Sequence, residues 1–246
     1  MLLRLAFLIS TAAAATFVHH FQRLELTSRP KLVIDLDNTC YSHSCGLNAS
    51  LISAIDAYAQ TKLGYDFESA KTESTRLYRQ YGMTSKGLAR DHNINLKDYE
   101  DFIDQNVDYT TIGHDDRLLE LLKKVEADVI VFTNSGIKHT TRTLEILGVL
   151  PYVHMVIYAE CMDPEFTVKP FQEAYGRVET LLQSDPSNLY FLDDNETNVR
   201  VAQERGWNVA HVFEFQEDAV VPSKNAIQVI KYIYDTPSVF SDLFAN

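Results

Sequence analysis

Two aspartates that follow a short apolar run are the residues of this chain best suited to chemistry. The run from Lys31 to Ile34 has the hydrophobicity of a buried strand, and Asp35 and Asp37 stand where that strand should end in a turn. Burying a carboxylate is costly unless something compensates its charge, and a second carboxylate nearby raises that cost. The pair therefore indicates a bound divalent cation or a chemical task; two turn-capping aspartates are the alternative.

Three more polar groups occur at comparable places further along the chain. They are Thr133 with Asn134, Lys169 before Pro170, and Asp193 with Asp194. Taken singly, each has a structural explanation, as a helix cap, a surface lysine at a helix start or a capping pair. Taken with Asp35 and Asp37, they bring acids, a hydroxyl group and a lysine to the ends of successive strands. This combination suits a divalent cation beside a phosphoryl group.

The elements that must position these residues alternate between strands and helices. Four later runs have continuous rather than alternating hydrophobicity, which is typical of strands covered on both faces in a parallel sheet: residues 128–132, 155–158, 188–192 and 208–212. Apolar stripes with helical spacing run from Leu118 to Val125 and from Phe171 to Leu181. The alternation predicts an α/β fold with a doubly wound parallel sheet, in which ligands bind beyond the carboxyl ends of the strands.

Residues 41–114 interrupt this alternation. They carry helical patterns without a convincing buried strand, and the stretch is far too long for a simple connection between two strands. We predict a helical cap over the site, inserted between the two parts of an α/β core formed by residues 31–40 and 115–246. Helices packed on the side of the sheet are the alternative.

Charge and cysteine content limit the classes of partner. A formal net charge of −12 over 246 residues argues against a polymeric nucleic acid, although a small phosphate ester can still be bound locally. Cys40, Cys45 and Cys161 have no zinc-ligand spacing and are too few for a disulfide framework, so we expect reduced thiols.

Residues 1–30 have the composition of a targeting segment or of a tail outside the fold. Arg4 precedes an apolar stretch from Leu5 to Val18 that is too short for a comfortable membrane span, so we expect no stable membrane insertion. The folded domain is expected to begin at Lys31. The protein is expected in the cytoplasm or, alternatively, in an organelle to which residues 1–30 direct it.

The polar groups stand in the order of the four motifs of the haloacid dehalogenase superfamily of phosphatases, which the chain resembles from about Lys31 to Val212. The motifs are Asp35-Leu36-Asp37-Asn38-Thr39, Thr133-Asn134, Lys169-Pro170 and Asp193-Asp194-Asn195. The resemblance implies a magnesium-dependent phosphomonoesterase in which Asp35 is the nucleophile that forms an aspartyl-phosphate. It makes Asp37 the general acid and base. The dehalogenases of the superfamily lack an acid at that position, and the transport ATPases have threonine there.

The same resemblance implies the remaining site residues. The phosphoryl oxygens would be held by Thr133, Asn134 and Lys169. The magnesium ligands would be Asp35, the main-chain carbonyl group of Asp37, Asp193 and Asp194. Of the acidic pair, Asp194 is expected to bind the metal directly and Asp193 to support it.

Three segments resemble the pyrimidine 5′-nucleotidase branch of the superfamily: Asp37–Tyr41, Tyr81–Leu88 and Asp193–Arg200. This resemblance implies that nucleoside 5′-monophosphates are the substrates and that Tyr81, Thr84 and Lys86 of the cap contact the base or ribose. An ordinary helix–helix turn is the alternative for that cap segment. The alternative functions are a phosphatase for lysophosphatidate or a phosphosugar, a phosphomutase, and an inactive binding protein.

Overall fold

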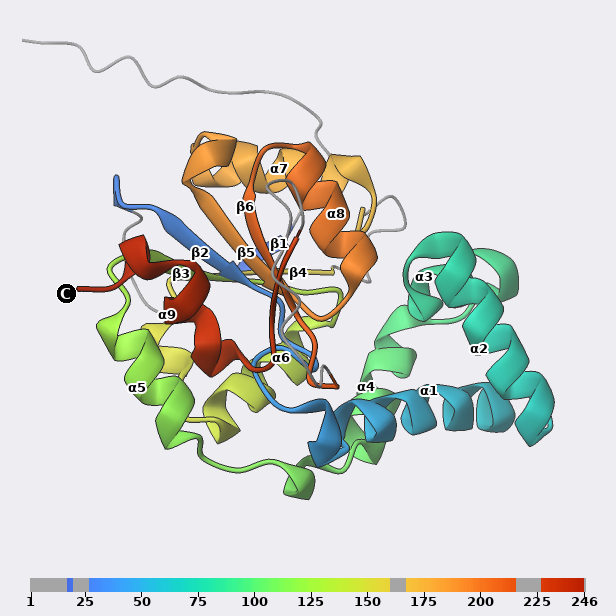
Figure 1. The fold of residues 1–246 in the computed structure, drawn as a ribbon. Coiled ribbons are helices and arrows are strands. Elements are labelled where there is room, and N and C mark those ends of the chain that lie inside the picture. The colour runs from blue at the N-terminus through green and yellow to red at the C-terminus, as the bar shows by residue number, and fades with distance from the viewer. Residues whose placement is uncertain (1–16, 20–26, 160–166, 216–226, 246) are drawn as a thin grey trace, which may run out of the picture.

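A central sheet carries helices on both faces, and a separate group of helices extends beyond one of its edges (Figure 1). The structure is a computed structural model, and it describes residues 17–19, 27–159, 167–215 and 227–245. The predicted α/β class, with a doubly wound sheet and a helical insertion, is confirmed.

The described residues form a sheet of seven strands. In spatial order they are β1 (Phe17–His19), β4 (Met155–Tyr158), β3 (Asp128–Phe132), β2 (Lys31–Ile34), β5 (Leu189–Asp193), β6 (Asn208–Val212) and β7 (Gln228–Ile230). All neighbours are parallel except β1 and β4, which are antiparallel. The chain runs outward from β2 through β3 to β4 and then returns to β5 on the other side of β2. The loops after β2 and β5 therefore lie next to each other, where an open sheet of this kind binds its ligand.

Two groups of helices cover the two faces of the sheet (Figure 1). One group is α7 (Gln172–Leu182) and α8 (Glu196–Glu204); the other is α5 (Asp116–Lys124), α6 (Ile137–Ile146) and α9 (Thr236–Val239). Strand β2 shows why three successive residues, Leu32, Val33 and Ile34, are all hydrophobic. Val33 packs in the core beneath α7 and α8, whereas Leu32 and Ile34 pack in the core on the opposite face. Burial on both faces leaves no position for alternating polar residues.

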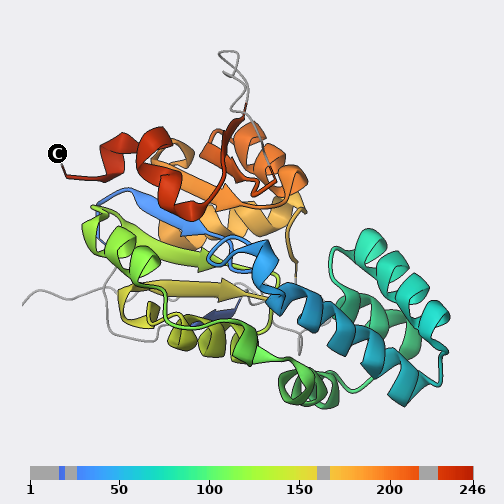
Figure 2. The ribbon, with the colours of Figure 1, turned by 60° about the horizontal axis from the view of Figure 1, so that its bottom comes forward.

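The helical insertion between β2 and β3 contains four helices. They are α1 (Leu47–Leu63), α2 (Phe67–Tyr81), α3 (Thr84–His92) and α4 (Leu96–Asn106). Their ends have local causes: Asp66 accepts a bond from the N–H of Ser69 at the start of α2, and Gly82, with φ of 74°, ends it. Figure 2 shows these helices beyond the arrowheads of the strands, on the side where the site residues follow the sheet. The exact cap boundaries, 41 and 114, stay a prediction.

The edge strands β1 and β7 differ from the expectation. Each has only three residues, too few for a hydrophobic period to show in the sequence. Strand β1 precedes Lys31, so the fold includes residues before the point where we expected it to begin. The rest of the predicted targeting segment, residues 1–16 and 20–26, lies outside the described residues, as does Cys161. The two cysteines that are described, Cys40 and Cys45, are free thiols.

A search of the described part of the chain for a helix both long enough and apolar enough to cross a membrane finds none.

Candidate active site

Asp35, the residue after β2, lies at the middle of the carboxyl edge of the sheet. Its N–H donates to the carbonyl oxygen of Leu192 on β5 at 2.9 Å, which fixes the point where the side chain leaves the sheet. Its Oδ1 accepts a bond from Lys169 Nζ at 2.6 Å, and its Oδ2 accepts one from Thr39 Oγ1 at 3.3 Å. The residue is 7% exposed and lines a cavity. A carboxylate held in this way can attack an electrophile that enters the cavity.

Lys169 is a buried cation between two carboxylates. Its Nζ lies 2.6 Å from Asp35 Oδ1 and 2.7 Å from Asp193 Oδ2, and it faces the rings of Phe132 and Phe191. Burial alone would lower the pKa of this ammonium group, but Asp193 and Asp35 outweigh that effect and raise it. Lys169 is therefore a permanent positive charge beside the carboxylate of Asp35.

The two acids after β5 have different surroundings. Asp193 is fully buried, and both of its oxygens accept bonds from Asn198 Nδ2 while Oδ2 also pairs with Lys169. Asp194 is less buried, lines the cavity and accepts a bond from Asn38 Nδ2 at 3.1 Å. Asp194 thus keeps lone pairs for a ligand in the cavity, whereas Asp193 is occupied by the protein.

The acid cluster carries more negative charge than the protein neutralises. Carboxylate oxygens of Asp35, Asp193 and Asp194 lie within 4.8 Å of one another, and the only cation that the described residues place on them is Lys169. Burial, reinforced by the neighbouring acids, raises the pKa of Asp35 well above its ordinary value and that of Asp194 to about 7. Oδ1 of Asn38 is also buried without a hydrogen-bond partner. An oxygen-only donor set with excess negative charge fits a hard divalent cation such as Mg²⁺.

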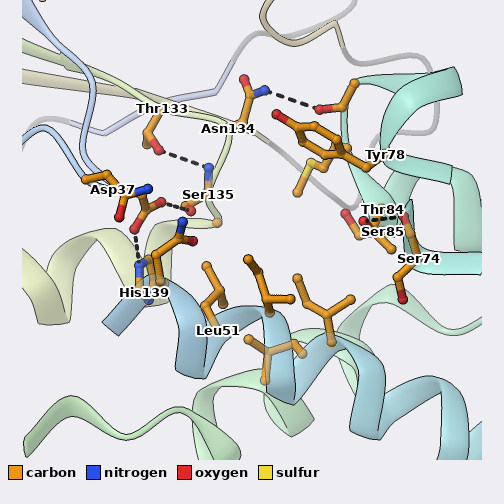
Figure 3. A pocket seen from close by; sticks show the side chains of 18 of the residues that line it. Asp37, Leu51, Ser74, Tyr78, Thr84, Ser85, Thr133, Asn134, Ser135 and His139 are labelled. Carbon is orange, nitrogen blue, oxygen red and sulfur yellow. Dashed lines mark hydrogen bonds and ion pairs between the residues drawn. The ribbon is translucent and has the colours of Figure 1, made fainter. Parts of the chain in front are cut away.

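Asp37 is held by three side-chain donors. Its Oδ1 accepts a bond from the hydroxyl group of Tyr41 at 2.5 Å. The same oxygen accepts one from His139 Nε2 at 2.8 Å, and Oδ2 accepts one from Ser135 Oγ at 2.5 Å (Figure 3). Nε2 carries the proton, because a carboxylate can only accept, and Nδ1 lies 3.0 Å from the hydroxyl group of Tyr109. Burial alone would raise the pKa of Asp37, but His139 and the two hydroxyl donors lower it to about 2. Asp37 is therefore a carboxylate in contact with an N–H donor.

The turn after β3 joins the remaining site residues. The hydroxyl oxygen of Thr133 accepts a bond from the N–H of Ser135 at 3.0 Å and can still donate its own proton into the cavity. The side-chain amide of Asn134 accepts from the N–H of Lys169 and donates to the carbonyl oxygens of Lys169 and, at 3.4 Å, Gly82. The Asn134 side chain thus joins this turn to the Lys169 loop and to the cap, which leaves its main chain as its route to a phosphoryl oxygen.

A family model of haloacid dehalogenase-like hydrolases matches residues 32–206, which is more than half of the chain and includes every motif described above. The chain belongs to this family of hydrolases.

Relatives of this hydrolase include a yeast protein and several solved structures. Phosphate metabolism protein 8 of Saccharomyces cerevisiae is 30% identical over 220 residues, which cover 81% of this chain and 66%, just under two thirds, of the yeast protein. An HAD phosphatase from Thermococcus onnurineus has a TM-score of 0.56 at 16% identity, with 88% of this chain and 100% of that chain covered. The HAD-hydrolase YfnB from Bacillus subtilis, bound to magnesium, has a TM-score of 0.57 at 15% identity, with coverages of 87% and 99%. At such low identities the two structures show a shared fold.

The predicted site residues did not include the three residues that contact Asp37, which are Tyr41, Ser135 and His139, nor Tyr109 behind His139. The sequence carries a weak signal for two of them, because Tyr41 follows Asp37 by four residues and His139 follows Ser135 by four, the spacing of one helical turn. Ser135 and His139 lie 98 and 102 residues from Asp37. Tyr109 comes from the short segment after the cap, and no spacing connects it to the site.

The cavity of the hydrolase has a volume of about 500 Å³ and lies between the cap and the loops that follow β2, β3 and β5 (Figure 3). Thr84 is one of its lining residues, and its hydroxyl group donates to a main-chain oxygen of α2 at 3.3 Å. Tyr81 and Lys86, which were predicted with Thr84 to contact the substrate, are not among the lining residues. The hydroxyl group of Tyr81 instead donates to Asp91 on α3 at 2.7 Å.

Proposed function

We propose that this hydrolase is a magnesium-dependent phosphomonoesterase that works through an aspartyl-phosphate on Asp35. The observation that carries the proposal is the set of charges around that carboxylate. Lys169 bonds to it, the acids Asp193 and Asp194 cluster with it, and Asp37 stands two residues further on in contact with an N–H donor. These groups supply a nucleophile, a fixed positive charge and an acid cluster that suits a cation, and together they support phosphoryl transfer to a carboxylate.

Asp35 and Lys169 act in the first step. A carboxylate oxygen of Asp35 attacks phosphorus while the bond between phosphorus and the ester oxygen breaks. Lys169 and the hydroxyl group of Thr133 hold the non-bridging oxygens, where negative charge develops. In its doubly protonated form, His139 passes a proton from Nε2 to Asp37, 2.8 Å away, and Asp37 passes it to the leaving oxygen. A neutral imidazole and an ionised Asp37 remain.

Asp37 acts as a base in the second step. Its low pKa keeps it ionised, so it can take a proton from a water molecule that attacks the phosphorus of the aspartyl-phosphate. The acyl phosphate bond breaks, Asp35 is restored as a carboxylate, and inorganic phosphate leaves.

The residues that would hold Mg²⁺ are Asp35, Asp194 and the main-chain carbonyl group of Asp37, with Asp193 supporting them through Lys169 and Asn198. A bound divalent cation screens the repulsion between the phosphate dianion and the carboxylate of Asp35.

For the substrate we propose a nucleoside 5′-monophosphate with a pyrimidine base. A volume of about 500 Å³ lies within the range of roughly 300–1,000 Å³ that is usual for small-molecule sites. Cap residues such as Leu51, Ile55 and Ile103 line the cavity and offer apolar contact to a flat ring. The name of the yeast relative refers to phosphate metabolism, which agrees with a phosphate ester as substrate. Lysophosphatidate and phosphosugars are the competing esters.

Phosphate release from a panel of esters tests this proposal. With Mg²⁺ present, we expect faster release from pyrimidine nucleoside monophosphates than from lysophosphatidate or sugar phosphates, and no release in EDTA. Asp35→Asn should lower kcat by at least about 10³-fold, because an amide is a poor nucleophile, and should retain the fold. Retained turnover in this variant would refute the assignment of Asp35 as the nucleophile. Equal rates on all esters would refute a nucleotide as the preferred substrate.

A further inference from the structure

Two polar side chains of the cap line the cavity without the partners that buried polar groups require. Asp56, on α1, is 7% exposed, and its Oδ1 has no hydrogen-bond partner. Ser74, on the neighbouring helix α2, is 9% exposed, and its Oγ has none either. An unpaired buried carboxylate or hydroxyl group destabilises a protein, so its persistence in a cavity lining points to a ligand that completes it.

These two residues belong to the cap, across the cavity from the catalytic loops. Figure 3 shows Asp37, Ser135 and His139 on one side and Ser74 on the other, with Leu51 of α1 between the two. A phosphoryl group at Asp35 would leave the alcohol part of the ester on the cap side of the cavity, which Asp56 and Ser74 line.

The chemistry of the pair restricts what that alcohol carries. A carboxylate oxygen only accepts hydrogen bonds, so Asp56 requires an N–H or O–H donor, whereas a hydroxyl group such as that of Ser74 can also serve an acceptor. The nearby walls at Leu51, Ile55 and Ile103 are apolar and suit the faces of a ring. An acyl chain offers no donor, and its entry would strip water from Asp56 without replacing it.

We propose that Asp56 and Ser74 form a subsite for the hydrogen-bonding edge of a nucleobase. Asp56 accepts a bond from an exocyclic amino group such as that of cytosine, and Ser74 donates to the ring acceptor beside it. This inference rests on the proposed phosphatase function and names the part of its substrate that the cap recognises. It makes cytidine monophosphate a favoured substrate over an ester whose leaving alcohol carries no amino group.

Equilibrium binding of the nucleoside tests the subsite independently of catalysis. We expect cytidine to bind Asp56→Ala about tenfold or more weakly than the unaltered protein, because a charged hydrogen bond is lost. Cytidine dimethylated on its exocyclic nitrogen cannot donate there, so it should bind the unaltered protein about tenfold more weakly than cytidine. Asp56→Ala should leave the affinity for this analogue unchanged. The four affinities form a thermodynamic cycle that measures the interaction between Asp56 and the exocyclic amino group.

Matched variants control for general effects on the cap. Asp98→Ala removes an acid from α4 that pairs with Lys62 at the surface, and Ser53→Ala removes an exposed hydroxyl group from α1. Both variants should bind cytidine with the affinity of the unaltered protein, whereas Ser74→Ala should lower that affinity severalfold. Thermal unfolding should show Asp56→Ala at least as stable as the unaltered protein, since an unpaired buried acid has been removed.

The outcomes separate this inference from the function on which it rests. Two results would overturn the proposed subsite, even if the protein released phosphate from nucleotides: Asp56→Ala weakens the binding of cytidine and of its dimethylated analogue equally, or it weakens neither. If the protein released no phosphate from any ester but bound cytidine in the predicted pattern, the proposed phosphatase function would be overturned. The proposed subsite would then still stand.

Discussion

At the scale of single residues, Asp35 and Asp37 are two carboxylates with opposite electrostatic surroundings. Burial and neighbouring acids raise the pKa of Asp35, so a bound cation would keep it ionised for its proposed role as nucleophile. His139, Ser135 and Tyr41 lower the pKa of Asp37 to about 2, so it is ionised without one. When their surroundings shift the pKa values of two acids in opposite directions, one site can give two side chains of the same type different catalytic roles.

Replacing His139 tests the role of the group behind Asp37. In His139→Ala, Asp37 loses its largest stabilising partner, so its pKa should rise and the acidic limb of the kcat profile should move to higher pH. At neutral pH we expect kcat to fall by about 10- to 100-fold, because the proton for the leaving group has lost its donor.

Tyr109→Phe is the matched control, since it removes only the hydroxyl group that contacts the far nitrogen of His139. Its kcat should fall by less than that of His139→Ala. An unchanged profile in His139→Ala would show that this histidine only fills space.

At the scale of elements, the cap touches the catalytic loops through the end of α2. Gly82 has φ of 74°, and a Cβ at this position would lie 3.1 Å from the carbonyl oxygen of Lys169, the ring of Phe171 and a methyl group of Val168. Its own carbonyl oxygen accepts a bond from Asn134 Nδ2. The absence of a side chain therefore allows the cap to pack on the loop that carries Lys169.

A comparison of two glycine variants tests this contact. Gly64 ends α1 with the same φ of 74°, but a Cβ there would have no atom within 4 Å. Gly82→Ala and Gly64→Ala should both lower the free energy of unfolding by about 1 kcal/mol through backbone strain. Only Gly82→Ala should also lower kcat/KM, because its methyl group pushes the cap away from Lys169. Equal kcat/KM values in the two variants would contradict this role.

At the scale of the whole molecule, the strand order brings distant acids together and so couples metal binding to stability. Asp35 follows β2 and Asp194 follows β5, and these strands are neighbours only because the chain crosses the sheet after β4. Folding without a cation therefore forces the acids into one cluster, and it raises the pKa of Asp194 to about 7.

This coupling predicts how stability depends on pH. A raised pKa means that the folded, metal-free protein binds a proton that the unfolded chain has released above about pH 4, so stability should fall as pH rises from 5.5 to 8. Mg²⁺ requires the ionised acids, so it should raise the Tm more at pH 8 than at pH 5.5. Thermal unfolding in EDTA and in Mg²⁺ measures both effects.

Asp194→Asn provides the reference for that measurement. The variant removes one titrating acid, so the stability in EDTA should depend less on pH. The increase in Tm that Mg²⁺ produces should also be smaller. The same pH dependence in the variant and in the unaltered protein would assign it to other groups.

The sequence by itself determined the five central strands, the helical insertion and the loops that carry the candidate site. A strand covered on both faces has continuous rather than alternating hydrophobicity, so its end can be located in the sequence. A charged group buried at that end is costly unless its charge is compensated. These two local patterns identified Asp35, Asp37, Lys169, Asp193 and Asp194. Only the tertiary structure decided which acid faces the cavity, which donors hold Asp37, and which cap residues are left without a partner. Those features depend on contacts between segments about 100 residues apart, as in the bond between Asp37 and His139, and a local pattern carries no record of such contacts. The short edge strand β1 was decided in the same way, since three residues form a strand only against a neighbour already in place.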